Sequence, residues 1–212
     1  MNKFLVLCSI FSILIISFFA IELFSQKGDD KINGFNQSIK FESDKKYQKA
    51  LEALTKIYDD NKSDYLINLR LGWLYYMTAD YSKSKDFYQN ALNLHPTGIE
   101  PMLGLTLPLA ALNEWDNVKT IYLNILKLDP GNYTANLRLG QYYNYRKDYK
   151  TAQTYLEKMK NLYPGLYEVN LSLGWTYFYL GKTAAAKELF TNALMLSAGD
   201  TLALQGLKLI RN

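Results

Sequence analysis

The chain has 212 residues, of which 49% are hydrophobic and 15% are aromatic, and its formal net charge at pH 7 is +4. This apolar fraction excludes a mainly disordered protein, and the interspersed acidic and basic residues argue against a basic block for binding nucleic acid. One cysteine, Cys8, and one histidine, His95, are too few for a disulfide framework or for a metal site built from several such ligands.

Residues 1–25 are expected to lie outside the folded domain. Lys3 precedes an uncharged apolar run over residues 4–21, which is typical of a secretory signal peptide. A run of this length is also close to the minimum that spans ~30 Å of hydrocarbon, so the alternative is an uncleaved membrane anchor with membrane contact through residues 4–21. We therefore predict an extracytoplasmic location, periplasmic or secreted, or attachment to a membrane by this segment. The polar residues 26–33 are expected to form a linker.

Two sequence markers recur along the rest of the chain at the same interval. Leu-Gly pairs occupy residues 71–72, 139–140 and 173–174. Prolines occupy residues 96, 130 and 164. Each step is 34 residues or twice that number, so two independent markers share one period. The chain is therefore predicted to be a repeat protein.

The period resembles that of the tetratricopeptide-repeat family, in which each repeat folds as two antiparallel helices. A small residue at the eighth position of the repeat lets these helices approach closely. Here that position holds Gly72, Thr106, Gly140 and Gly174. The resemblance implies an all-α fold, a right-handed superhelical solenoid of about five antiparallel helix hairpins with a C-terminal capping helix. We expect this domain to cover residues 31–212, with repeats at about residues 31–64, 65–98, 99–132, 133–166 and 167–200 and the capping helix at 201–212.

The chain departs from the family at its tryptophans. The family usually has Trp at the fourth position, where this chain has Asn68, Met102, Asn136 and Asn170. Its own tryptophans stand at the ninth position, as Trp73 and Trp175, and at the seventeenth, as Trp115. Because the seventeenth position packs between helices in the family, we expect Trp115 to lie in the core.

The resemblance also implies a binding surface, because five positions on the first helix of each repeat line the concave face of the family's superhelix. Spacings of three and four place these positions on one side of a helix. The large side chains expected there are Trp73, Tyr76, Met77, Leu107, Tyr145, Trp175, Phe178 and Tyr179. Exposed apolar patches commonly mark binding sites, and Trp and Tyr dominate binding hot spots, so we predict a partner-binding groove. The alternative is that these side chains only pack between neighbouring first helices.

Two further features bear on this groove. Arg70 and Arg138, at the sixth position, are candidates for contacting an acidic group of a ligand, or are solvated surface residues. Pro108 removes a hydrogen bond to the carbonyl of Gly104, which predicts a kink. Together with Ala110 and Ala111 this kink is expected to open a shallow pocket at the centre of the groove, or else to be a tolerated irregularity.

Catalytic and cofactor-binding motifs are absent from the sequence. The chain has one histidine, His95, at the predicted end of a helix, and no cysteine outside residues 1–25, so we predict no nucleophile–base pair of the Ser/His or Cys/His kind. No Gly-rich phosphate-binding loop occurs. We therefore predict a non-enzymatic scaffold without cofactors that binds a protein or peptide partner and no nucleic acid, with envelope assembly or protein quality control as its setting. The alternatives are a membrane-anchored adaptor and a glycan- or cell-wall-binding module that uses the same Trp and Tyr face.

Overall fold

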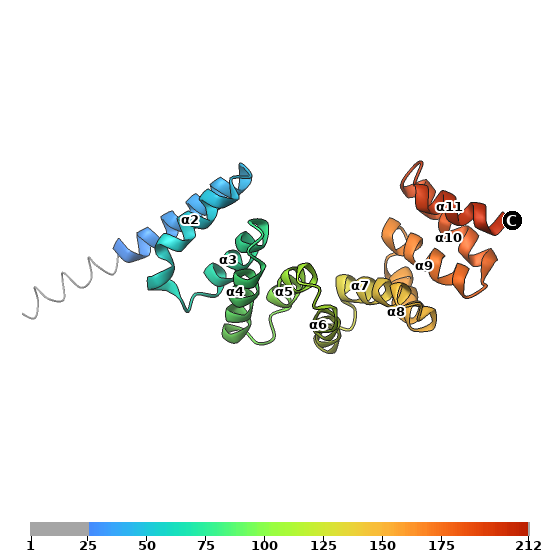
Figure 1. Ribbon diagram of the computed structural model, residues 1–212, viewed down its shortest axis with the longest axis horizontal. Coiled ribbons are helices and arrows are strands. Elements are labelled where there is room, and N and C mark those ends of the chain that lie inside the picture. The colour runs from blue at the N-terminus through green and yellow to red at the C-terminus, as the bar shows by residue number, and fades with distance from the viewer. Residues whose placement is uncertain (1–25, 212) are drawn as a thin grey trace, which may run out of the picture. The chain divides into compact units, whose positions relative to one another are not determined.

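In the computed structural model, which describes residues 26–211, the chain is an array of α-helices, and no strand occurs in that range (Figure 1). Residues 26–43 are helical. The helices that follow are α2 Tyr47–Tyr58, α3 Tyr65–Met77, α4 Tyr81–Leu94, α5 Ile99–Ala111, α6 Trp115–Leu128, α7 Tyr133–Tyr145, α8 Tyr149–Leu162, α9 Tyr167–Tyr179, α10 Thr183–Leu196 and α11 Thr201–Arg211, with a short 3-10 helix, η1, at Asp59–Asn61. The predicted all-α class is confirmed.

The helices recur at the predicted interval. The first helices of successive repeats, together with α11, begin 34 residues apart, at Tyr65, Ile99, Tyr133, Tyr167 and Thr201. The second helices begin at the same interval, at Tyr81, Trp115, Tyr149 and Thr183. The array of helix hairpins that the period predicted is therefore confirmed.

Side-chain caps fix where several of these helices begin. Asp64 accepts a hydrogen bond from the backbone N–H of Ile67 at 3.0 Å, and Asn132 accepts one from Ala135 at 3.1 Å. Helices α4, α8 and α11 are capped in the same way by Asp80, Asp148 and Asp200. Each oxygen satisfies a backbone donor that the first helical turn leaves unpaired.

Three buried asparagines at the fourth position of the first helices tie down the turn that precedes each helix. The Nδ2 group of Asn68 donates to the carbonyl oxygens of Lys62 and Asp64 at 2.8 and 2.7 Å. Asn136 and Asn170 bond the carbonyls at the same two offsets, at distances between 2.8 and 3.1 Å. A hydrogen-bonding amide thus occupies the position where the family usually has Trp, and it satisfies backbone groups at the junction between repeats.

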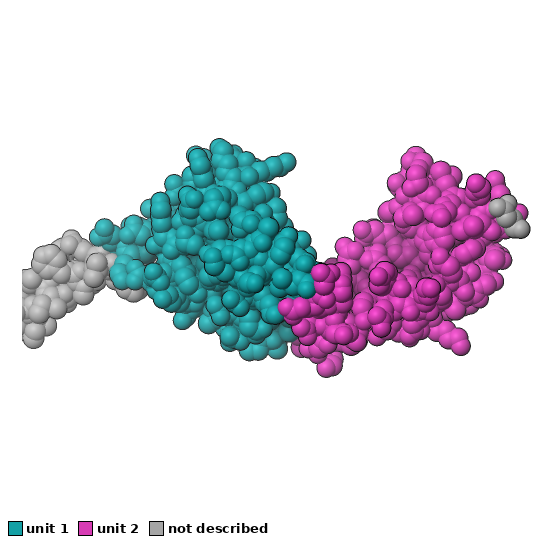
Figure 2. Space-filling view, in the orientation of Figure 1, with its two compact units in different colours: residues 1–112 teal, residues 113–212 magenta. Residues whose placement is uncertain are grey.

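Within residues 26–211, the array divides into two compact units, with the boundary between residues 112 and 113 (Figure 2). The division falls between α5 and α6, inside the expected repeat 99–132. That repeat has Thr106 and Val118 at the eighth and twentieth positions, where the other full repeats have Gly, Ser or Ala. Each unit has its own core.

The core of the first unit contains a cluster with the fully buried Leu54 of α2 and Leu71 of α3. The ring of Tyr88 of α4 is also buried, with 3% of its surface exposed, and lies against Gly72 and Gly104. A Cβ atom at Gly72 would lie 2.8 Å from the Tyr88 ring, and one at Gly104 would overlap the same ring. Only glycine therefore lets α3 and α5 approach the ring this closely.

Leu156 and Phe190 have the corresponding role in the second unit, and both are fully buried. A Cβ atom at Gly140 of α7 would overlap the Leu156 side chain, and one at Gly206 of α11 would overlap the Phe190 ring. The C-terminal helix thus closes on Phe190 of α10, which is the packing expected of a capping helix.

The segment before α2 differs from the expectation of a linker. Residues 26–33 are helical and continue into the first helix of the N-terminal repeat. Lys27 and Lys31 pair with Asp60 and Asp64 at 3.2 and 2.5 Å, which ties this polar helix to the turn after α2. No helix within residues 26–211 is long and apolar enough to cross a membrane. The predicted signal peptide or anchor lies outside the described residues.

The prediction that Trp115 belongs to the core was wrong, because its side chain is 51% exposed at the start of α6. At the same repeat position Tyr81 contacts the ring of Tyr76, with centroids 5.7 Å apart. The residue equivalent to Tyr76 in the repeat of Trp115 is Ala110, which has no ring to offer.

Candidate functional site

Four predicted residues of α3 form a strip that we call the α3 face. They are Trp73 and the residues three or four positions from it, Arg70, Tyr76 and Met77. The rings of Trp73 and Tyr76 are stacked, with centroids 5.9 Å apart and an interplanar angle of 29°. All four side chains are half-buried, so each keeps some surface that a partner can cover.

Arg70 and Trp73 are joined by a carboxylate from the helical segment before α2. Glu42 accepts a hydrogen bond from Trp73 Nε1 at 2.7 Å and forms an ion pair with Arg70. Arg70 Nε also donates to Ser38 Oγ at 3.2 Å, and its guanidinium lies over the Phe35 ring, 5.5 Å from the centroid. Burial lowers the pKa of Arg70, and the charge of Glu42 opposes that shift. Arg70 is therefore held within the first unit and is not a free surface cation.

A pocket of about 340 Å³ lies beside this network in the first unit. It is lined by the helical segment before α2 and by α3, α4 and α5, through Phe35, Leu66, Leu69, Arg70, Trp73, Tyr88, Glu100 and Gly104. Gly104 belongs to this lining, whereas Pro108, Ala110 and Ala111, around which a pocket was expected, do not. The helix α5 continues through Pro108 from Ile99 to Ala111.

Glu100 gives this pocket a negative character. Its side chain is exposed and, within residues 26–211, no hydrogen bond or ion pair engages its carboxylate. Burial raises the pKa of Tyr88 on the pocket wall, and the charge of Glu100 raises it further. Burial and Glu100 also raise the pKa of Tyr65. A phenol loses its proton less readily near a negative charge, so both tyrosines report the field of Glu100.

In the second unit, Trp175, Phe178 and Tyr179 form what we call the α9 face. The Trp175 centroid lies 5.7 Å from Phe178 and 6.0 Å from Tyr179. Tyr179 is stacked on Tyr149 at 4.6 Å and remains 54% exposed. Trp175 also contacts the buried ring of Phe190 at 5.1 Å. One edge of this cluster is therefore anchored in the core, and the other is open to solvent.

Helix α7 carries a polar network that includes the predicted residue Arg138. Gln141 Nε2 donates to Ser172 Oγ at 3.2 Å, and Asn144 Nδ2 donates to the Ser172 carbonyl at 3.0 Å. Arg138 is exposed and donates to Gln141 Oε1 at 2.9 Å. Tyr145, the last residue of α7, is 86% exposed and takes no part in the ring contacts of the α9 face.

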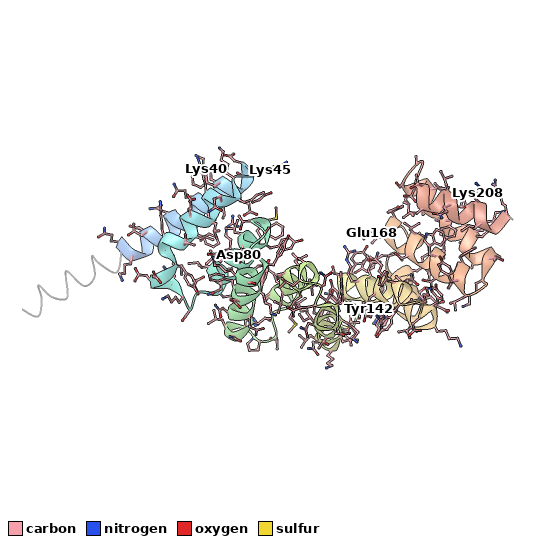
Figure 3. All side chains as sticks on the ribbon, viewed as in Figure 1. Lys40, Lys45, Asp80, Tyr142, Glu168 and Lys208 are labelled. Atoms are coloured by element: carbon pink, nitrogen blue, oxygen red, sulfur yellow. The ribbon has the colours of Figure 1, made fainter. Side chains whose placement is uncertain are left out.

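A carboxylate occupies the second position of a first helix in both units. Glu100 lies in the first turn of α5. Glu168, which is labelled in Figure 3, lies in the first turn of α9. Glu168, unlike Glu100, has a partner, because the Tyr133 hydroxyl donates to it at 3.4 Å. The two positions are thus equivalent in the repeat but differ in their surroundings.

The structure brings the predicted residues together in two local groups. In the first unit Arg70 and Trp73 line the pocket, whereas Met77 and Leu107 are half-buried outside its lining. In the second unit the α9 face is a connected cluster, from which Tyr145 is separate.

Two residues of the network were missed by sequence reasoning. Phe35 and Glu42 belong to the N-terminal repeat, whose pattern is the weakest. Counted from residue 31, they stand at the fifth and twelfth positions, which are those of Leu69 and Tyr76 in the next repeat. If the concave-face positions had also been applied to the N-terminal repeat, both residues would have been predicted.

Two family models, each described as a tetratricopeptide repeat, match the chain. One matches residues 167–200, and the other matches residues 68–98 and 134–165. These segments coincide with the hairpins α9–α10, α3–α4 and α7–α8, and none of the three covers the repeat 99–132. No curated protein matches the chain at a significant level.

Several solved structures resemble the fold. MamA is 19% identical with a TM-score of 0.69, and the match covers 80% of this chain and 92% of MamA. A tetratricopeptide repeat protein from Parabacteroides merdae is 16% identical with a TM-score of 0.75, over 86% of this chain and 72% of that protein. YrrB, described as a TPR protein with an unusual peptide-binding site, is 19% identical with a TM-score of 0.69, over 89% and 97%. At such low identity the likeness concerns the fold alone.

Proposed function

We propose that this chain, which carries tetratricopeptide repeats at residues 68–98, 134–165 and 167–200, is a protein-interaction scaffold without enzymatic activity. In this proposal a peptide or a helix of a partner protein binds to the α3 face and to the α9 face. The observation that carries the proposal is that one repeat position holds both Trp73 and Trp175, and that each indole is stacked on a tyrosine of its own helix.

Stacked rings suit this role because they are ordered before a partner arrives. Trp73 is held by its hydrogen bond to Glu42, and Trp175 is held against Phe190. Little side-chain freedom is therefore lost on binding. A partner that covers the remaining ring surface gains roughly 25 cal/mol per Å² of apolar area. Trp and Tyr are also the residues that most often dominate the energetics of protein interfaces.

A peptide ligand is also the class of ligand named for one protein of similar fold, since YrrB is described as having a peptide-binding site. For this chain we propose a location outside the cytoplasm, periplasmic or secreted, in envelope assembly or protein quality control. The support for this location is the uncharged apolar run 4–21 behind Lys3. Attachment to a membrane through the same run is the alternative.

Affinity capture from the native host with the full-length protein tests the proposal. The double variant Trp73→Ala, Trp175→Ala is expected to keep the helical circular dichroism spectrum and to lose the partners that the wild type recovers. Trp115→Ala is the matched control, because Trp115 is exposed but lies on a second helix, and it is expected to retain them. Recovery of the same partners by the double variant would refute the two faces as binding surfaces.

In the same samples, the intact mass of the protein shows whether residues 1–25 are removed, as for a signal peptide, or kept, as for an anchor.

A further inference from the structure

The pocket of the first unit has an unbalanced negative charge. Arg70 is the only basic residue among those that line it, and its charge is already paired with Glu42. Glu100 lines the same pocket, and no group within residues 26–211 neutralises it. Two carboxylates and one guanidinium therefore leave one negative charge in excess beside the aromatic rings.

The indole of Trp73 favours a cation at the same place. Its Nε1–H donates to the Glu42 carboxylate at 2.7 Å, and such a bond polarises the ring toward greater electron density. The face of an indole is the best aromatic surface for binding an ammonium or guanidinium group. The lining of the pocket thus includes both a carboxylate, from Glu100, and an indole, from Trp73.

We propose that this pocket binds a basic side chain, lysine or arginine, of the partner peptide, a proposal that rests on the proposed function above. The charged end of the side chain lies between Trp73 and Glu100, and its aliphatic stem lies against Leu66 and Leu69. Leu66 is 57% exposed, and the stems of Lys and Arg commonly cover apolar surface of this kind. A volume of about 340 Å³ is at the small end for ligand pockets, so it suits one side chain.

Other side chains fit this chemistry less well. An acidic side chain would be repelled by Glu100, and Arg70 offers little compensation because Glu42 and Ser38 already hold its guanidinium. A neutral apolar side chain would cover Glu100 without giving it a partner, and taking an unpaired charge out of water is costly. A basic side chain both covers the apolar wall and pairs with the carboxylate.

Glu168 provides a matched control for Glu100. It stands at the same repeat position and in the first turn of its helix, but its carboxylate is bonded by the Tyr133 hydroxyl. The first helix before it carries Gln141 at the position where α3 carries Trp73. The second unit therefore lacks the combination of indole and free carboxylate at this pair of positions, and loss of the Glu168 charge should not affect the binding of a basic side chain.

The test is an NMR titration of the full-length protein, in a non-ionic detergent, with four acetylated and amidated peptides. The peptides share glycine and alanine flanks and differ only in a central arginine, lysine, norleucine or glutamate. The indole N–H signal of Trp73, assigned with Trp73→Phe, reports binding at the pocket. The arginine and lysine peptides are expected to shift this signal saturably and to bind at least about fivefold more tightly than the other two.

Glu100→Gln is expected to weaken binding of the arginine peptide at least about fivefold, so that it binds no more tightly than the norleucine peptide. Glu168→Gln is expected to leave binding of the arginine peptide unchanged. The proposal is overturned if norleucine or glutamate binds as tightly as arginine, if the arginine preference survives in Glu100→Gln, or if no peptide shifts the Trp73 signal.

Partner capture distinguishes failure of this inference from failure of the proposed function. If Glu100→Gln keeps the partner while the double variant Trp73→Ala, Trp175→Ala loses it, the proposal of a bound basic side chain is wrong, and the proposal that partners bind to the two faces is retained. If the double variant keeps the partner, the proposal of the two binding faces is wrong, whatever the peptide titrations show.

Discussion

At the scale of single residues, Asn68, Asn136 and Asn170 shape the junctions between repeats. Each side chain is buried, and each amide donates to two backbone carbonyls of the preceding turn. Buried polar groups are tolerated when they are bonded in this way. In the remaining full repeat the equivalent residue is Met102, which has no donor to offer. The substitution of the family's Trp by Asn is therefore a structural feature of three junctions.

Replacing Asn136 tests this role. Asn136→Ala is expected to lower the free energy of unfolding by ~1–3 kcal/mol, because the turn carbonyls lose their donor in a buried place. Urea denaturation followed by circular dichroism measures the change. Asn161→Ala, at an exposed position of α8, should stay within ~0.5 kcal/mol of the wild type. Equal losses in the two variants would contradict the role given to Asn136.

At the scale of helices, pairs of a glycine and a large side chain set how closely two helices pack. Gly140 of α7 leaves room for Leu156 of α8, and Gly206 of α11 leaves room for Phe190 of α10. Because these neighbours are fully buried, they cannot move aside when a side chain is added.

Gly140→Leu is accordingly expected to destabilise the protein by ~3 kcal/mol or more, since a branched side chain would overlap Leu156. Thermal melting monitored by circular dichroism is a sufficient measurement. Gly165→Leu is the control, because a Cβ atom at Gly165 meets nothing within 4 Å, and it should melt close to the wild type. A wild-type melting curve for Gly140→Leu would show that α7 and α8 do not pack in this way.

The helices could be predicted from the sequence, whereas the contacts within the candidate site could not. Glycine, proline and aromatic residues recur every 34 residues because equivalent positions make equivalent packing contacts in each repeat. The bridge from Glu42 to Arg70 and Trp73 depends instead on the register between two first helices, and the period alone does not specify that register. The exposure of Trp115 was likewise not predictable from the period, because the period gives the position of a residue in the repeat and not its surroundings.

At the scale of the whole molecule, the chain consists of two compact units, and each has an aromatic face of its own. The first unit adds a pocket with an unpaired carboxylate, and the second adds a stack of rings anchored on Phe190. The sequence indicated the period but not this division, because a period describes each repeat separately, whereas compactness depends on side-chain packing summed over several repeats.

The most direct test of the account is site-specific photo-crosslinking of the full-length protein in its native host. A photoreactive amino acid would replace Leu66 or Tyr145, which are exposed on first helices, or Gln89 or Thr191, which are exposed at one equivalent position of second helices. We predict that the first pair forms crosslinks to a partner protein and that the second pair does not. Crosslinks from Gln89 and Thr191, with none from Leu66 and Tyr145, would contradict the claim that partners bind along the first helices.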